Sequence, residues 1–328
     1  MNILIVGGAG MVGRKLVERL AADGTLGGRT IKDVTLFDVV TPETPTGAPF
    51  PVATITGDLT TPGKAERLVA GRPDVIFHLA AIVSGEAEAD FEKGYRINLD
   101  GTRALLEAVR RSDHGYRPRF VFTSSIAVFG APFPADGIYD EFHLTPLTSY
   151  GTQKAICELL LADYSRRGFL DGVGIRLPTI CVRPGRPNKA ASGFFSGIIR
   201  EPLSGQEAIL PVEDTVRHWH ASPRAAVEFM IHAATMDTAP LGVRRSLTMP
   251  GLSATVAEQI AALRRVAGDR VAGLIRREPD PAIMTMVGGW PQNFNARRAE
   301  ALGFTAEARF DEIVQVYIDD ELGGRVPA

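Results

Sequence analysis

The chain has 328 residues, which is long enough for two compact lobes. Hydrophobic residues make up 45% and charged residues 23%, a balance that is ordinary for a globular protein and excludes a disordered one. The formal net charge of −2, without a dense run of arginine or lysine, gives no reason to expect a nucleic-acid partner.

Two cysteines, Cys157 and Cys181, have no ligand-like spacing to each other or to a histidine. We therefore expect neither a disulfide framework nor a structural zinc site, and a reducing compartment fits best. His218 and His220 lie two residues apart without an evident third ligand, so no metal is predicted. The first apolar run starts at Ile3 without a basic region before it, and no later run has the length of a membrane span. These features predict a cytoplasmic protein with no membrane partner.

Short apolar runs alternate with stretches of helical periodicity through the first half of the chain. This alternation is typical of a parallel sheet covered on both faces, so we predict an α/β fold with a Rossmann-type doubly wound parallel sheet. The expected strands are Asn2–Val6, Val34–Phe37, Ala53–Thr56, Val75–His78, Arg119–Thr123 and Val173–Leu177. The expected helices are Met11–Ala22, Ile97–Arg111 and a long one through Ala155–Tyr164.

The pattern changes after Pro178, where proline and glycine recur and the strands become short. We therefore divide the chain into a domain at 1–178 and a smaller C-terminal α+β lobe at 179–328. The pattern is also compatible with segments of 179–328 that return to the main sheet. Ser222 and Pro223 are typical of an N-cap and a first-turn proline, and they predict a helix through Ala234. Further helices are expected at Thr255–Val266 and Phe310–Leu322.

Gly7, Gly10 and Gly13 form a G-x-x-G-x-x-G motif between the first strand and the first helix. Glycine at such a turn permits positive φ, close approach of a pyrophosphate and tight packing of the helix on the strand. The helix N-terminus then offers free N–H groups and a positive dipole end to phosphates. A tight turn alone would also require glycines, but this context favours a dinucleotide site in residues 1–178.

Two acidic residues follow the next strands. Asp38 ends the second strand, where a carboxylate accepts hydrogen bonds from the adenosine ribose hydroxyls and repels a 2′-phosphate, which favours NAD over NADP. Asp58 follows the third strand, and it either binds the adenine amino group or caps its own loop.

Tyr150 and Lys154 are spaced i, i+4 at the start of an apolar helix, so both side chains lie on one face. Oxidation of an alcohol requires a base for the hydroxyl proton, and tyrosine, with a pKa near 10, needs help to act at neutral pH. A nearby ammonium provides that help by stabilising the phenolate. Alone, the Y-x-x-x-K pattern occurs often on helices by chance.

Thr123, Ser124 and Ser125 close the fourth strand at the carboxyl edge of the sheet, where ligands of such sheets bind. Ser125 is predicted to hydrogen-bond the reacting oxygen, and Thr123 to lie at the cofactor. A capping role would explain serines alone. The order of glycine loop, strand-end serines and Y-x-x-x-K makes coincidence improbable.

With these motifs the chain resembles the extended short-chain dehydrogenase/reductase family over nearly its whole length. The motifs that carry the resemblance are GGAGMVG (Gly7–Gly13), HLAA (His78–Ala81), N-x-x-G-T (Asn98–Thr102), SSIAVFG (Ser124–Gly130) and YGTQK (Tyr150–Lys154). Phe129 replaces the tyrosine that many relatives have, which we interpret as a packing change. The resemblance implies NAD as cofactor and adds contacts to it from Met11, Val12, Leu59, Leu79, Ala80, Ala81, Asn98, Tyr150, Lys154, Pro178 and Thr179.

The C-terminal lobe is expected to select the substrate, because family members diverge there. The sequence RLPTICVRPG, together with the segments Cys181–Leu203 and Val216–Ser222, resembles that of dehydrogenases of this family that act on a small sugar acid. That resemblance implies oxidation of the C2 hydroxyl to a 2-oxo acid. The substrate-binding residues expected in addition to Ser125 and Tyr150 are Ser84, Arg183, Asn188, Lys189, Ser192 and Arg217.

Two other interpretations stay open. A nucleotide-sugar epimerase or dehydratase would share every cofactor motif, and a non-catalytic NAD-sensing scaffold would share the fold but would not need the Ser125, Tyr150 and Lys154 set. The family resemblance also predicts a homodimer through the helices Asn98–Ser112 and Ser149–Gly168. The apolar residues on several faces of the second helix support this only weakly, because core burial explains most of them.

Overall fold

A computed structural model describes residues 1–112, 115–185 and 192–326. The chain divides into two compact units. Unit 1 comprises Met1–Val128, Pro146–Leu177 and Val227–Leu247, and unit 2 comprises Phe129–Thr145, Pro178–Ala226 and Thr248–Ala328. The backbone therefore passes between the units several times, and the segment 227–247 belongs to unit 1 although it follows much of unit 2 in the sequence.

Unit 1 is built on a seven-stranded sheet with the strand order β13-β9-β7-β6-β1-β4-β5. The ladders that join β5 through to β9 are parallel. The order reverses beside β1, as it does in doubly wound folds, and the predicted Rossmann-type fold is confirmed. The strands are β1 (Asn2–Val6), β4 (Asp33–Asp38), β5 (Val52–Thr56), β6 (Val75–His78), β7 (Arg119–Ser125), β9 (Asp171–Leu177) and β13 (Ser246–Thr248).

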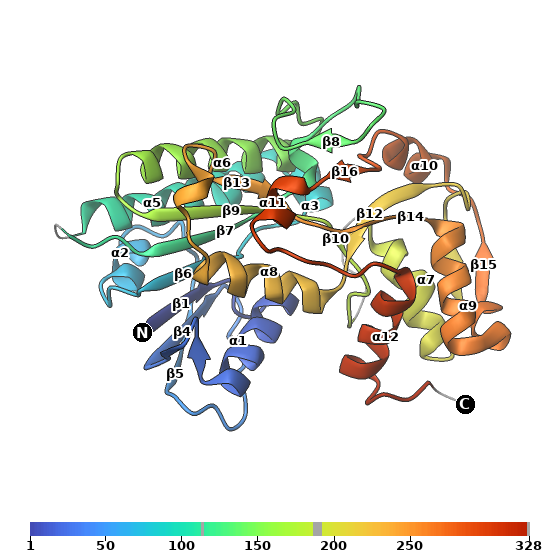
Figure 1. Ribbon diagram of the computed structural model, residues 1–328, viewed down its shortest axis with the longest axis horizontal. Coiled ribbons are helices and arrows are strands. Elements are labelled where there is room, and N and C mark those ends of the chain that lie inside the picture. The colour runs from blue at the N-terminus through green and yellow to red at the C-terminus, as the bar shows by residue number, and fades with distance from the viewer. Residues whose placement is uncertain (113–114, 186–191, 327–328) are drawn as a thin grey trace. The chain divides into compact units, whose positions relative to one another are not determined.

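Helices cover both faces of this sheet. Figure 1 shows α5 (Gly101–Arg111) and α6 (Ser149–Arg166) on one face, with α1 (Met11–Asp23) and most of α8 (Pro223–Thr235) on the other. The core beneath α5 and α6 is aromatic and aliphatic, because alternate strand residues such as Phe120 and Phe122 pack against helix residues such as Leu105, Leu106 and Leu161. The remaining elements of unit 1 are the hairpin β2 (Thr25–Leu26) and β3 (Arg29–Thr30), α2 (Lys64–Val69), α3 (Ser84–Ala89), α4 (Phe91–Gly94), the 3-10 turn η2 (Ile126–Val128) and the 3-10 turn η3 (Ala239–Leu241).

The helix expected at Ile97–Arg111 has two parts. Tyr95–Asp100 forms a π-helical turn, η1, and regular α-helix begins at Gly101. A π-turn inserts an extra residue into the helical register and often marks a functional position. Here it carries Asn98, whose side chain is buried.

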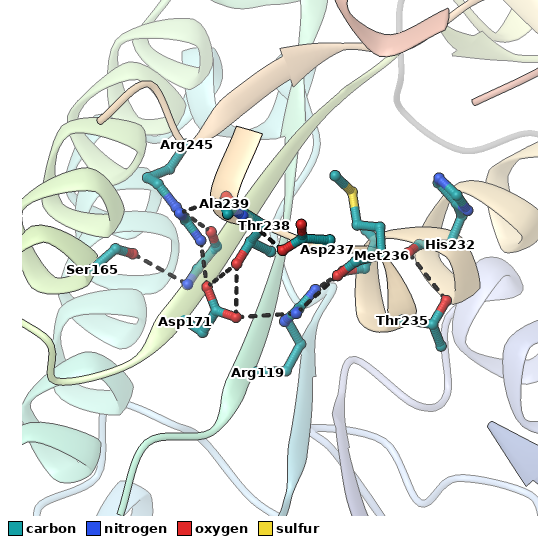
Figure 2. Close-up of polar contacts among 12 residues, drawn as sticks. Arg119, Ser165, Asp171, His232, Thr235, Met236, Asp237, Thr238, Ala239 and Arg245 are labelled. Carbon is teal, nitrogen blue, oxygen red and sulfur yellow. Dashed lines mark hydrogen bonds and ion pairs between the residues drawn. The ribbon is translucent and has the colours of Figure 1, made fainter. Parts of the chain in front are cut away.

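A polar cluster fastens the segment 227–247 to the amino end of β7 and β9 (Figure 2). The Asp171 carboxylate, at the start of β9, pairs with Arg119 at 3.0 Å and with Arg245. Thr238 donates to the same carboxylate at 2.8 Å, and Arg119 donates at 2.7 Å to the carbonyl of Ala233 at the end of α8. This clamp holds α8 and the start of β13 at the amino edge of the sheet. The carboxyl ends of β1, β4, β6 and β7 lie at the opposite edge.

Unit 2 combines small sheets with helices, in agreement with the predicted α+β lobe. Its sheets pair β10 (Thr179–Ile180), β12 (Arg217–Ala221) and β14 (Leu252–Thr255), then β11 (Ala208–Leu210) with β15 (Ile275–Arg277), and β8 (Ile138–Tyr139) with β16 (Phe294–Asn295). Its helices are α7 (Gly193–Leu203), α9 (Val256–Ala272, kinked at Gly268), α10 (Pro281–Gly288), α11 (Arg297–Ala301) and α12 (Phe310–Glu321). The apolar faces of α7, α9, α10 and α12 share one core, which includes Phe195, Ile199, Leu263 and Ile313.

Several helix starts follow the expected capping chemistry. The Ser222 hydroxyl accepts from the backbone N–H of Ala225 at 2.9 Å at the start of α8, which confirms the predicted N-cap. At α9, the Thr255 hydroxyl and the Glu258 carboxylate form a reciprocal capping box.

Candidate active site

The glycine loop at the end of β1 is shaped by close backbone contacts. Gly7 has φ 99°, and a Cβ on it would lie 2.6 Å from the backbone nitrogen of Ala80. A Cβ on Gly13 would lie 2.3 Å from the carbonyl oxygen of Gly7, so α1 begins directly against the loop. Both contacts are closer than a side chain tolerates, which explains the glycines and brings the loop beside the backbone of Leu79 and Ala80.

The start of α1 has the chemistry of a phosphate site. The N-cap of α1 is Gly10, which has no side chain that could accept a hydrogen bond from the helix. The first N–H groups of the helix, at Met11 and Val12, are therefore not capped by a carboxylate or hydroxyl of the N-cap residue. The α1 first turn contains no acidic residue that would repel an anion. This arrangement fits the pyrophosphate of a dinucleotide.

The two predicted acidic residues lie in different environments. The Asp38 carboxylate accepts from the backbone N–H groups of Ala9 and Val39 at 3.0 and 2.7 Å, which holds it beside the glycine loop. Asp58 accepts from both the hydroxyl and the backbone of Thr60, and it pairs with Arg96 at 2.7 Å. These partners lower the pKa of Asp58 against the opposing effect of burial. Asp58 thus caps its own loop, whereas Asp38 lies at the carboxyl end of β4 as a ribose-binding acid would.

Asn98 organises the segment that follows β6. Its amide accepts from the Ile82 N–H at 2.9 Å, donates to the Ile82 carbonyl at 3.2 Å, and donates to the Gln153 amide oxygen at 2.7 Å. This places Asn98 between the loop of Leu79–Ala81 and the helix that carries Tyr150. The loop leads directly to Ser84, the first residue of α3, which is half-buried.

Helix α6 begins in a well-defined position. The Thr148 hydroxyl caps it by accepting from the Gly151 N–H at 3.0 Å, and the Glu88 carboxylate accepts from the Ser149 N–H at 2.9 Å. A Cβ on Gly151 would lie 2.1 Å from the carbonyl oxygen of Ala127. Glycine at this position therefore allows the first turn of α6 to touch the turn that follows β7.

Lys154 is buried and lies between α6 and β7. Its ammonium donates to the carbonyl of Thr123 at 2.8 Å, and it lies 4.8 Å from the Phe122 ring centroid and 5.7 Å from that of Tyr150. Burial lowers the pKa of Lys154 to about 8, although Cys157 and Glu158 act in the opposite direction. Lys154 is therefore still an ammonium at neutral pH, one helical turn from the Tyr150 phenol.

Ser125 lies at the last residue of β7, two residues after the carbonyl that binds Lys154. Its hydroxyl accepts from the Ala127 N–H at 3.1 Å, so its own proton is available to a further acceptor. The Thr123 hydroxyl donates to the carbonyl of His78 at 3.1 Å, which ties β7 to β6 where both strands end. The structure thus brings the predicted serine to the strand end next to the predicted lysine.

The predicted residues of unit 2 form a separate set. The guanidinium of Arg183 donates to the carbonyl of Ile180 at 2.9 Å and to the hydroxyl of Ser192 at 3.0 Å. Arg217 donates to the carbonyl of Ser253 at 2.9 Å and its side chain is about one-third exposed (36%). The Thr179 hydroxyl forms a hydrogen bond of 2.7 Å with the buried ring of His218. Thr179 directly follows Pro178, which is also buried. The predicted contacts Asn188 and Lys189 lie outside the described residues.

Sequence reasoning missed three buried polar residues around Lys154, namely Gln153, Glu158 and Arg176. Glu158 follows Lys154 by four residues, the same spacing that singled out Tyr150 and Lys154, and that spacing could have indicated it. Gln153 and Arg176 gave no such signal, because their partners are distant in the sequence.

Neither a membrane span nor a metal cluster occurs in residues 1–112, 115–185 and 192–326. No helix there is long and apolar enough to cross a bilayer. The same residues contain no group of three His, Cys, Asp or Glu side chains arranged to hold a metal ion.

A Rossmann-type sheet with a glycine loop, a strand-end serine and a Y-x-x-x-K helix defines the class of short-chain, dinucleotide-dependent enzymes. Residues 3–239 match the model of the NAD dependent epimerase/dehydratase family, and the chain belongs to this family. The cofactor of this family is NAD, which agrees with the glycine cradle and with the carboxylate of Asp38.

The similarity to two curated proteins and to one solved structure extends over almost the whole chain. The chain is 50% identical to D-erythronate dehydrogenase of Cupriavidus necator, over 98% of both chains. It is 41% identical to D-erythronate dehydrogenase of Haemophilus influenzae, over 98% of this chain and all of the relative. A crystal structure described as the nucleoside-diphosphate-sugar epimerase from Agrobacterium tumefaciens is 66% identical, with a TM-score of 0.97 over 100% of this chain and 96% of that one.

Proposed function

We propose that this enzyme oxidises the C2 hydroxyl of D-erythronate to the 2-oxo acid with NAD as acceptor. The observation that carries the proposal is the similarity to two D-erythronate dehydrogenases, which are 50% and 41% identical over 98% of this chain. It is combined with the set of Ser125, Tyr150 and Lys154 on β7 and α6. The family match supports NAD as the acceptor.

The proposed chemistry assigns one role to each residue. Tyr150, as phenolate, accepts the proton of the C2 hydroxyl, and the Lys154 ammonium one helical turn away stabilises that phenolate. Ser125 donates a hydrogen bond to the reacting oxygen. NAD, when bound, would supply the acceptor for the hydride from C2. The products are then a 2-oxo acid, the reduced cofactor and one proton.

The proposal also assigns binding roles to the predicted residues. In unit 1, Gly7, Gly10 and the start of α1 hold the pyrophosphate, Asp38 holds the adenosine ribose, and Lys154 has a second role at the nicotinamide ribose. Thr123, Leu79–Ala81, Asn98 and the Asp58–Leu59 loop complete the cofactor contacts, with Pro178 and Thr179. Recognition of the substrate belongs to Ser84 and to the arginines and hydroxyls of unit 2, Arg183, Ser192 and Arg217 with Asn188 and Lys189, because a guanidinium pairs well with a carboxylate.

A homodimer through α5 and α6 is also part of the proposal. Leu159 on α6 is 66% exposed, which is high for a leucine on a helix that otherwise packs against the sheet. A cytoplasmic location is supported by two free, buried cysteines, Cys157 and Cys181. Size-exclusion chromatography with light scattering tests the dimer, and Leu159→Glu would shift a dimer to monomer.

A second candidate function is nucleotide-sugar epimerisation. The observation that favours it is the 66% identical crystal structure described as a nucleoside-diphosphate-sugar epimerase. An epimerase returns the hydride to its substrate, so it produces no net NADH.

The two candidates are separated by following absorbance at 340 nm with purified protein. The panel contains NAD or NADP with four- to six-carbon aldonates and uronates, D-erythronate among them, and separate reactions contain UDP-glucose. We expect NADH formation with D-erythronate and NAD. Turnover of the nucleotide-sugar without NADH, together with silence on the aldonates, would replace the proposed function with the epimerase.

A further inference from the structure

A buried ion pair connects α6 to the carboxyl ends of β7 and β9. Glu158 and Arg176 have side chains only 3% and 6% exposed, and the Arg176 guanidinium donates to both carboxylate oxygens, at 2.8 to 3.1 Å. The Ser124 hydroxyl donates to the same carboxylate at 2.5 Å. Three elements of unit 1 therefore meet at one carboxylate.

This carboxylate adjoins the proposed proton-transfer residues on two sides. Glu158 lies one helical turn after Lys154 on α6, so the two side chains occupy the same face of the helix. Its partner Ser124 precedes Ser125, and the Thr123 carbonyl on the other side of Ser124 binds Lys154. A substitution of Glu158 would thus alter the surroundings of Lys154 on α6. It would also alter the position of Ser124, the residue before Ser125.

The stability of the fold does not by itself account for such a pair. Removing two charges from water costs about as much as their mutual attraction returns, and apolar residues of similar volume are often equally stable. The Glu158 carboxylate is, in contrast, a negative charge close to a buried ammonium. The other titratable groups around Lys154 are Tyr150 and Cys157 on α6, His78 on β6, and Arg176 on β9, which faces Glu158.

We propose that Glu158, held by Arg176 and Ser124, is a positioning residue that keeps the Lys154 ammonium charged and fixes the strand end that carries Ser125. The proposal rests on the proposed proton transfer at Tyr150. Of the groups near Lys154, Glu158 and Cys157 are the ones that favour its charged form, and burial raises the pKa of Cys157 to about 11, so that thiol is neutral at physiological pH. The Glu158 carboxylate, in its ion pair with Arg176, is therefore the group on this face of α6 that favours the charged form of Lys154.

Two variants separate this role from a structural one. Glu158→Gln keeps the volume and removes the charge, although it leaves Arg176 buried without its counter-ion. The double variant Glu158→Leu with Arg176→Met removes both charges and fills the space with apolar groups, so that the fold is retained. Asp171→Asn is the matched control, because it breaks the ion pairs with Arg119 and Arg245 at the opposite end of β7 and β9.

Activity against pH is the first measurement. We expect both Glu158 variants to lose about tenfold in kcat at pH 7 and to show the alkaline limb of the kcat profile about one pH unit lower, because Lys154 loses its proton more easily. NAD affinity should stay near that of the wild type. Asp171→Asn should lower the melting temperature and leave the pH profile unchanged. A double variant with wild-type kcat and pH profile would show that the pair is structural only.

A second measurement is independent of the substrate. Absorbance at 295 nm, taken as the difference between each protein and its Tyr150→Phe counterpart, follows ionisation of the Tyr150 phenol. We expect this ionisation at higher pH in both Glu158 variants, since a neutral Lys154 no longer stabilises the phenolate. An unchanged titration would overturn the inference even if D-erythronate proves not to be the substrate, and a shifted one would support it in that case too.

Discussion

Tyr150 is the residue on which the proposed chemistry depends most directly. Tyr150→Phe removes the proton acceptor while keeping the ring beside Lys154, so kcat should fall about 1,000-fold with NAD affinity nearly unchanged. Steady-state kinetics and titration of NAD fluorescence quenching measure the two quantities. Tyr139→Phe is the control, because Tyr139 is a partly exposed residue of β8 that bonds to Asp136. If Tyr150→Phe retained most of its kcat, another group would have to take the proton.

Among single residues, the sequence was informative where chemistry and spacing coincide. Tyr150, Lys154 and Ser125 could be predicted because each belongs to a short motif with a fixed place on a helix or strand. The roles of Asn98 and Glu158 depend on partners 55 and 18 residues away in the chain, Gln153 and Arg176, and no local pattern reports such contacts. The bonding of Asp58 to Arg96, 38 residues further on, was hidden for the same reason.

Among the elements, the contact between α6 and the turn after β7 positions the first turn of the helix. Gly151→Ala would place a methyl group 2.1 Å from the carbonyl oxygen of Ala127, so the first turn of α6 must move away from that turn. Overpacking of this kind costs about 1–3 kcal/mol, and the displacement of Tyr150 should lower kcat at least about tenfold. Thermal unfolding and kinetics measure the two effects.

Gly288→Ala provides the matched control for that substitution. Gly288 ends α10, and a Cβ there would meet no described atom within 4 Å beyond its chain neighbours and the backbone of its own helix. This variant should keep wild-type kcat and melt at an equal or higher temperature. Equal loss of kcat in both variants would contradict the importance of the contact between Gly151 and Ala127.

The strands and long helices were the most predictable elements, since short, near-continuous apolar runs that alternate with helical stretches are typical of a buried parallel sheet. The π-turn at Tyr95–Asp100 could not be foreseen, because its residues have ordinary helical propensity and the contacts of Asn98 within it are made with residues distant in the chain. Strand β13 was equally hidden: Ser246–Thr248 is three residues long, and the Asp171 clamp that fixes the preceding segment is a tertiary feature.

For the whole molecule, buried histidines predict how stability depends on pH. Burial lowers the pKa of His78 to about 3 and that of His218 to about 4, and it lowers the pKa of His220 well below its usual value. Between pH 6.5 and 4 the unfolded chain binds protons at these rings that the folded chain does not bind, so the free energy of unfolding falls as the pH falls through this range. Urea unfolding at pH 7.5 and pH 5.0 measures the loss.

The contribution of one ring can be isolated by substitution. His218→Gln should lower stability at both pH values, because its bonds to Thr179 and the Pro291 carbonyl are lost, and it should reduce the difference between them. His143→Gln, at an exposed position, should leave that difference unchanged. An undiminished pH difference in His218→Gln would contradict the assignment of the loss to the buried rings.

The most direct test of the proposed function is the fate of the hydrogen on C2. D-erythronate deuterated at C2 is incubated with the enzyme and NAD, and the cofactor and the acid are then analysed by mass spectrometry. We expect one deuterium in each reduced cofactor molecule and a 2-oxo acid without deuterium at C2. Unlabelled NADH, which would mean oxidation at another carbon, or recovery of the acid without any reduced cofactor, would contradict the proposed reaction.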